Sequence, residues 1–158
     1  MKVEKAKVSD VQRIHELVNK FAEKGLMLPR ALSELYENLR DFFVIRDSNK
    51  EVIGCAALHV NWADLAEIKS LAVSETKQAK GLGSTLIEAC LDEARELEIP
   101  TVFCLTYKPS LFERYKFRQI DKMELPRKVW SECYRCPKFP DCDEVALVYN
   151  FEPRSDLM

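Results

Sequence analysis

Apolar residues recur along this chain with two periods, one typical of helices and one typical of strands. Apolar positions three to four residues apart predict helices that bury one face. These helices span residues 11–25, 32–39, 84–97 and 109–115. Ser9 and Gln12 form a predicted capping box at the start of the first helix, in which each side chain satisfies a backbone N–H.

The predicted strands are apolar, β-branched runs bounded by turn residues. They span residues 2–8, 42–46, 52–60, 67–73, 101–106 and 145–149. The polar turn at 47–50 joins two of them into a β-hairpin, and a second turn follows at 61–64. The sequence contains no repeat or linker, so we expect one mixed α/β domain over residues 1–158.

Composition narrows the class of protein. Hydrophobic residues make up 47% and charged residues 32%, which excludes an intrinsically disordered chain. A net charge of -2 gives no reason to expect nucleic acid or a membrane surface as a partner. No apolar run is long enough to span a bilayer, and the N-terminus lacks a signal-peptide core, so we expect a cytoplasmic location. The oligomeric state is left open, a homodimer included.

The loop between the 67–73 strand and the 84–97 helix carries the clearest chemical signal. It contains Lys77, Lys80, Gly81 and Gly83. A helix N-terminus offers backbone N–H groups and the positive end of the helix dipole, and glycines let a phosphate approach closely. The loop therefore predicts a diphosphate site, with a ligand-free helix entry as the alternative. Its spacing matches neither the dinucleotide fingerprint nor the P-loop.

The arrangement Gln78-x-x-Gly81-x-Gly83 resembles the acyl-CoA signature of the GNAT superfamily of N-acetyltransferases. Residues 66–73 also resemble the corresponding strand of that superfamily's histone acetyltransferases. The resemblance covers nearly the whole chain in the order of its elements. It implies a GNAT α/β fold, in which a mixed, largely antiparallel sheet with helices on both faces is splayed around the co-substrate acetyl-CoA.

The resemblance also implies roles for individual residues. Backbone groups of Leu71, Ala72 and Val73 would pair with the pantetheine arm, and the Leu71 N–H would serve catalysis by stabilising the oxyanion. Glu67 matches the catalytic glutamate, which takes a proton from the attacking amine; the alternative is a solvated glutamate at a strand end. The diphosphate would be held by the residues that follow, Gln78, Ala79, Lys80, Gly81, Leu82, Gly83 and Ser84.

One departure concerns the general acid. Many superfamily members carry a tyrosine in the last helix that reprotonates the CoA thiolate, and Phe112 stands at that position here. Tyr115 lies on another face of that helix, and Tyr107 is a weaker candidate. A thiol with a pKa of ~8.5 leaves readily near neutral pH without a protein acid. A non-catalytic acyl-CoA-binding regulatory module is the non-enzymatic alternative.

Within the superfamily, the chain is similar to the acetyltransferase module of N-acetylglutamate synthases. Residues 28–30, 34–42, 54–58 and 66–73 carry this similarity, and Phe112 is shared with these synthases. It implies acetylation of the α-amine of L-glutamate, a step of arginine biosynthesis. Arg30 and Lys69 are suitable cations for the two carboxylates of glutamate, although both could be ordinary surface charges. Another amino acid, a polyamine or a protein N-terminus is the alternative acceptor.

The six cysteines fall into two groups. Cys55, Cys90 and Cys104 lie in apolar stretches, where a thiol packs as a small hydrophobe. The other three have a spacing similar to that of zinc ligands, but no fourth cysteine or histidine lies nearby. We therefore assign no metal and expect packing thiols, with zinc as the alternative. This second group consists of Cys133, Cys136 and Cys142. A metal site built from His15 and His59 is not expected.

Overall fold

A mixed sheet runs through the protein, and the computed structural model describes residues 2–27, 29–75, 81–125 and 144–151. Within these ranges the sheet has seven strands, and only the β4–β5 pair is parallel. In sheet order the strands are β1 (Val3–Lys5), β2 (Phe42–Arg46), β3 (Val52–Trp62), β4 (Leu65–Val73), β5 (Thr101–Thr106), β7 (Val145–Asn150) and β6 (Arg118–Ile120). This confirms the predicted largely antiparallel sheet. The residue pattern had not marked β6, a three-residue strand.

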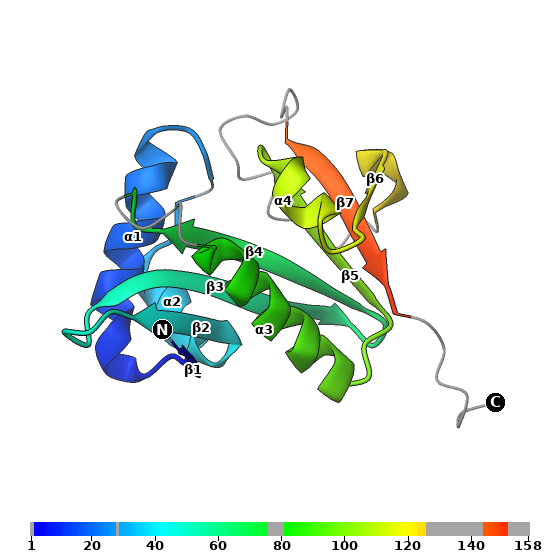
Figure 1. Ribbon diagram of the computed structural model, residues 1–158. Helices are drawn as coiled ribbons and strands as arrows, with labels where there is room; N and C mark the ends of the chain where they lie inside the picture. The colour runs from blue at the N-terminus through cyan, green and yellow to red at the C-terminus, as the bar shows by residue number, and fades with distance from the viewer. Residues whose placement is uncertain (1, 28, 76–80, 126–143, 152–158) are drawn as a thin grey trace.

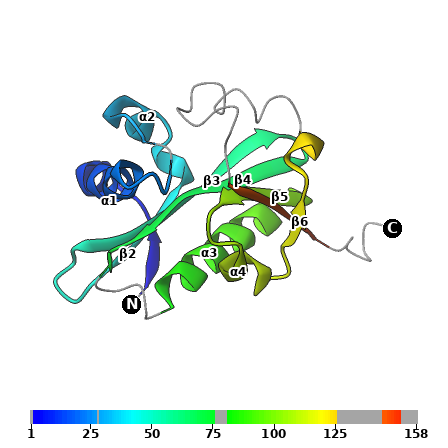
Figure 2. The same cartoon turned by 90° about the horizontal axis from the view of Figure 1, so that it is seen from above.

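Helices cover both faces of the sheet, as predicted (Figure 2). α1 (Val11–Glu23) and α2 (Leu32–Glu37) lie on one face, and α3 (Leu82–Glu96) and α4 (Pro109–Glu113) lie on the other. α1 buries the apolar positions whose spacing predicted it, namely Val11, Ile14, Leu17, Val18 and Phe21. α3 does the same with Leu82, Leu86, Ile87, Cys90, Leu91 and Ala94. In the part of the chain that is described, no helix is long and apolar enough to cross a membrane.

Two of the three hydrophobic clusters among the described residues pack helices onto the sheet. One packs α1 and α2 on side chains of β2, β3 and β4 that include Val44, Cys55, Ala57 and Ala72. The other packs α3 and α4 on the opposite face and continues to Cys104 and Leu147 on β5 and β7. The α3 cluster therefore extends from β4 to β5 across the region where the two strands separate.

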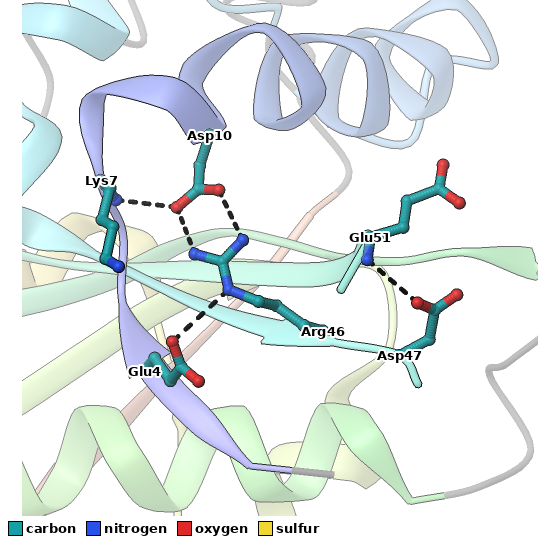
Figure 3. A network of polar contacts seen from close by, with 6 residues as sticks. All are labelled: Glu4, Lys7, Asp10, Arg46, Asp47 and Glu51. Atoms are coloured by element: carbon teal, nitrogen blue, oxygen red, sulfur yellow. Dashed lines mark hydrogen bonds and ion pairs between the residues drawn. The ribbon is translucent and has the colours of Figure 1, made fainter. Parts of the chain in front are cut away.

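The start of α1 differs from the prediction. Ser9 is exposed inside a 3-10 turn, η1 (Val8–Asp10), so the capping box of Ser9 and Gln12 is wrong. The carboxylate of Asp10 organises this turn instead, by accepting the Lys7 N–H at 2.8 Å. Two guanidinium nitrogens of Arg46 also donate to Asp10, each at 2.7 Å, and Arg46 Nε donates to Glu4 at 3.4 Å (Figure 3).

Burial explains why Asp10 takes these partners. The residue is 4% exposed, and an ionised carboxylate in such a place needs charged and hydrogen-bonded neighbours. Burial alone would raise the pKa of Asp10, but the hydrogen bonds from Arg46 and Lys7 and the Arg46 charge lower it below its ordinary value. Arg46 lies 36 residues further along the chain, beyond the reach of a local capping rule.

The hairpin between β2 and β3 is confirmed, and its turn is built around one side chain. Asp47 accepts the backbone N–H of Asn49 at 2.9 Å. It also accepts that of Glu51 at 3.0 Å (Figure 3). Such a carboxylate stabilises a tight turn by replacing backbone hydrogen bonds. The hairpin aligns β3, the strand that carries the residues facing β4.

Candidate active site

β4 and β5 pair over only part of their length. The parallel register joins Leu65 to Thr101, Ala66 to Val102 and Glu67 to Phe103. β4 then runs on to Val73 while β5 continues along β7, and the two strands diverge (Figure 1). We call the region beyond Glu67 and Phe103 the β4/β5 split. Because the strands are parallel, both carboxyl ends lie in this split, and one edge of β4 faces it.

A β-bulge interrupts β4 inside the split. On the β3 side, Cys55 pairs with Ala72 and Ala57 pairs with Lys69, so Ala56 alone faces both Ser70 and Leu71. Ser70 has φ of 56°, a left-handed conformation that costs a residue with a side chain roughly 1–2 kcal/mol. Such bulges occur next to active sites, where they redirect backbone groups.

Glu67 stands at the last paired position before the split and is only 7% exposed. Its cross-strand neighbour is His59, and Lys69 lies opposite Ala57 two residues further along. Side chains of alternate residues share a face, so Glu67 and Lys69 lie on the same face, as predicted. It is the α1 and α2 face, because Ala57 belongs to the cluster packed against those helices. The Glu67 charge also affects Cys104 on β5. Burial is the main cause that raises the pKa of Cys104, and the charges of Glu67 and Glu144 raise it further.

His59 is a neighbour of the site that sequence reasoning missed. It was considered only as a metal ligand, whereas the register puts it beside Glu67. Its Nδ1 lies 2.7 Å from the Asp41 carboxylate, in the 3-10 turn η2 (Leu39–Asp41). Counting residues outward from the turn between β3 and β4 could have predicted this pair, but the bulge between Val60 and Trp62 shifts the strand register by one residue.

Arg30 is held between α1 and α2. Its backbone N–H donates to Asn19 Oδ1 at 3.1 Å, and Asn19 Nδ2 donates back to the Arg30 carbonyl at 3.0 Å. Its guanidinium lies 3.6 Å from the Glu34 carboxylate and its side chain is 10% exposed. Arg30 therefore lies in the layer of α1 and α2, the layer over the sheet face that carries Glu67 and Lys69.

The first turn of α3 begins at Gly81, whose φ is 74°. Among the described residues, a Cβ there would meet nothing within 4 Å, whereas a Cβ on Gly83 would lie 3.3 Å from Leu111 of α4. The two glycines of the motif thus have different structural roles: Gly81 allows the left-handed turn, and Gly83 allows α4 to approach α3. Leu82 is buried and Ser84 is half-buried. Gln78, Ala79 and Lys80 lie outside the described residues.

The aromatic residues in and just after α4 do not fit the role of a general acid. Phe112 is 4% exposed and packs edge-to-face on Phe117, with 5.3 Å between the ring centroids. The Tyr115 hydroxyl donates to Glu88 of α3 at 3.0 Å. Burial raises the pKa of Tyr115, and the hydrogen bond with Ser84 opposes this. Tyr107 directly follows β5, and its role as an acid stays a prediction.

The thiols of the sheet and of α3 are buried in the core, as predicted. Cys55, Cys90 and Cys104 are buried and free. Burial raises the pKa of Cys55 and that of Cys90 to about 12, so these thiols are not ionised near neutral pH. The described residues contain no group of three or more His, Cys, Asp or Glu side chains that could hold a metal ion. Cys133, Cys136 and Cys142 lie outside these residues.

Comparison with known proteins agrees with this geometry. Residues 11–117 match the model of the acetyltransferase (GNAT) family. An uncharacterized N-acetyltransferase of Chlorobaculum tepidum is 38% identical over 146 residues, which are 92% of this chain and 94% of that protein. The amino-acid acetyltransferase of Mycobacterium tuberculosis is 36% identical over 84% of this chain and 77% of its own length.

A solved structure extends the comparison to bound molecules. N-acetylglutamate synthase from Neisseria gonorrhoeae, complexed with coenzyme A and N-acetyl-glutamate, superimposes with a TM-score of 0.84 at 26% identity. The match covers 96% of this chain and 35% of that one. The family model, the relatives and the split sheet agree, and the chain belongs to the GNAT family as an acetyl-CoA-dependent N-acetyltransferase related to the amino-acid acetyltransferases.

Proposed function

We propose that this enzyme acetylates the α-amine of L-glutamate in the β4/β5 split, as a step of arginine biosynthesis. The observation that carries the proposal is the placement of Glu67 and Lys69 on one face of β4 at the opening of the split. A base for the amine and a cation for a carboxylate are then two residues apart on one strand. The names of the M. tuberculosis and Neisseria relatives support an amino acid as the acceptor.

Recognition of glutamate requires cations for two carboxylates. Lys69 is one, and Arg30 is the second, supplied from the α1 and α2 layer over the same face. Asn19 fixes the backbone of Arg30, so little conformational entropy remains to be lost there when a carboxylate binds. Glu34 lies 3.6 Å from the guanidinium and orients it. Charge-assisted hydrogen bonds of this kind select an acidic amino acid over a neutral one.

The residues along the split fit acetyl-CoA, which supplies the activated acetyl thioester. The β4 edge from Leu71 to Val73 holds the pantetheine arm as an added strand would be held. The diphosphate lies at the start of α3, where Gly81 carries no Cβ and Leu82, Gly83 and Ser84 present backbone N–H groups. Gln78, Ala79 and Lys80 complete this binding loop in the proposal.

Glu67 is the general base in this proposal. The amine arrives as an ammonium ion without a lone pair, and Glu67 takes one proton from it, directly or through a water molecule. The freed nitrogen then forms a bond to the acetyl carbon. The Leu71 N–H stabilises the negative charge that develops on the carbonyl oxygen. The carbon–sulfur bond breaks, the nitrogen loses its second proton to become an amide, and the sulfur takes up one proton as coenzyme A leaves.

An acceptor screen tests the proposed function. Purified protein is incubated with acetyl-CoA and each of the twenty amino acids, thiol release is followed, and products are identified by mass spectrometry. We expect glutamate to have the highest kcat/KM, with glutamine well behind because it lacks the side-chain charge. Preference for glutamine, a polyamine or a peptide N-terminus would refute glutamate as the acceptor and leave the acetyltransferase intact.

A further inference from the structure

The β-bulge of β4 is held by a side chain from the neighbouring strand. Ser70 is one of the few non-glycine residues with positive φ in the described chain, and it lies inside a strand rather than in a turn. Strain of this kind persists only where the surroundings fix the conformation. The register also deprives Ser70 and Leu71 of individual partners on β3, since both face Ala56. Something else must therefore hold the backbone here.

The thiol of Cys55 spans the bulge. Cys55 is fully buried on β3 and pairs in register with Ala72. Its Sγ donates to the carbonyl oxygen of Ser70 at 3.4 Å. The backbone N–H of Ala72 hydrogen-bonds to the same sulfur and lowers the pKa of the thiol, although burial outweighs it and raises that pKa to about 12. The thiol thus stays protonated near neutral pH, and its S–H remains available as the donor.

Peptide geometry carries this contact to the other side of β4. The Ser70 carbonyl and the Leu71 N–H belong to one planar trans peptide unit and point in opposite directions. The carbonyl is turned toward Cys55 on β3. The Leu71 N–H is therefore turned away from β3, toward the side of β4 on which β5 has diverged. This is the side where the proposed function places the acetyl thioester.

We propose that Cys55 is a positioning residue. By hydrogen-bonding to Ser70 and Ala72, at the two ends of the bulge, it orients the Leu71 N–H toward the β4/β5 split. The inference rests on the proposed function of the split. It explains why the strand can hold a left-handed serine without a glycine: a polarisable thiol accepts from Ala72 and donates to Ser70 at 3.4 Å. Cys55 itself touches no substrate.

Three variants test this role. Cys55→Ala removes the donor, and Cys55→Ser keeps a donor and acceptor with a shorter reach. Cys90→Ala removes an equally buried thiol of α3 that packs on the opposite face of the sheet. We expect Cys55→Ala to lower kcat by about 10-fold or more, below the ~10²–10³-fold cost of deleting an oxyanion donor outright. The KM for acetyl-CoA should stay nearly unchanged, because the other contacts remain. Cys55→Ser should recover most of kcat, and Cys90→Ala should retain it.

A second readout needs no acceptor. The carbonyl stretch of bound [1-¹³C]acetyl-CoA reports the hydrogen bond from Leu71, and it should lie at lower wavenumber in the wild type and Cys55→Ser than in Cys55→Ala. If Cys55→Ala does not fold, Cys55→Val fills the space without a donor. A wild-type kcat and carbonyl stretch in the folded donorless variant would overturn the role of Cys55. A wild type that shows the stretch but acetylates no amino acid would instead refute the proposed function.

Discussion

Replacing Asp10 with asparagine tests how the edge of the sheet is held together. The substitution keeps the size of the side chain and an acceptor for the Lys7 N–H, but it removes the charge that faces Arg46. The side chains of Asp10 and Arg46 are 5% and 20% exposed. Breaking a fully buried ion pair costs about 3–5 kcal/mol, and hydrogen bonds to charged groups contribute about 1.5–3 kcal/mol. Because Arg46 retains its hydrogen bond to Glu4 and some contact with water, we expect the free energy of unfolding to fall by about 2–4 kcal/mol.

Denaturant unfolding measures this loss, and for a chain of this size the melting temperature should fall by about 4–16 °C. The matched control is Asp92→Asn, which removes an exposed partner of Arg95 at 3.2 Å and should change stability by less than about 1 kcal/mol. The folded-state pKa of Asp10 is lowered, so its stabilisation is present above the ordinary aspartate pKa and is lost as the pH falls through the folded value. The gap between wild type and Asp10→Asn should therefore narrow in acid. A change below about 0.5 kcal/mol at pH 7 would refute the reasoning.

Three further predictions concern ligands. Gly81→Glu should abolish the stabilisation of the protein by acetyl-CoA, because a carboxylate would enter the proposed diphosphate site. Gly81→Ala should cost roughly 1–2 kcal/mol of stability through its positive φ and keep most of the acetyl-CoA binding. Unchanged acetyl-CoA affinity in a folded Gly81→Glu would contradict this prediction. Arg30→Ala should raise the KM for glutamate by an amount equivalent to about 1.5–3 kcal/mol in steady-state assays, and an unchanged KM would remove Arg30 from the site. If Cys133 and its two neighbours hold zinc, elemental analysis should find about one equivalent; protein free of metal and insensitive to chelators would leave them as packing thiols.

Much of the fold was predictable because local patterns agree with tertiary packing. The apolar spacing of α1 predicted its buried face, and the alternation of β4 predicted that Glu67 and Lys69 share a face. The β2–β3 hairpin followed from its polar turn. In each case the determinant lies within a few residues of the chain, where periodicity and turn chemistry are informative.

The errors and omissions have a common physical origin. The capping box at Ser9 was wrong because the partner of Asp10 comes from β2, far along the chain. The proximity of His59 to Glu67 depends on the bulge between Val60 and Trp62 in the β3–β4 register, which no local pattern signals. The hydrogen bond from Cys55 to Ser70 depends on the second bulge, between Cys55 and Ala57, so a cysteine identified only as apolar packing also holds a backbone carbonyl.

The central claim is that Glu67 removes the amine proton at the opening of the β4/β5 split, and the kcat of Glu67→Gln as a function of pH tests it most directly. Acetyl-CoA binding, measured by thermal shift, should remain nearly intact, because the proposed acetyl-CoA contacts lie on other residues. With glutamate as acceptor, we expect kcat to fall by roughly 10²–10⁴-fold, most strongly at low pH, where free amine is scarcest. Full activity of Glu67→Gln at every pH tested would contradict the account.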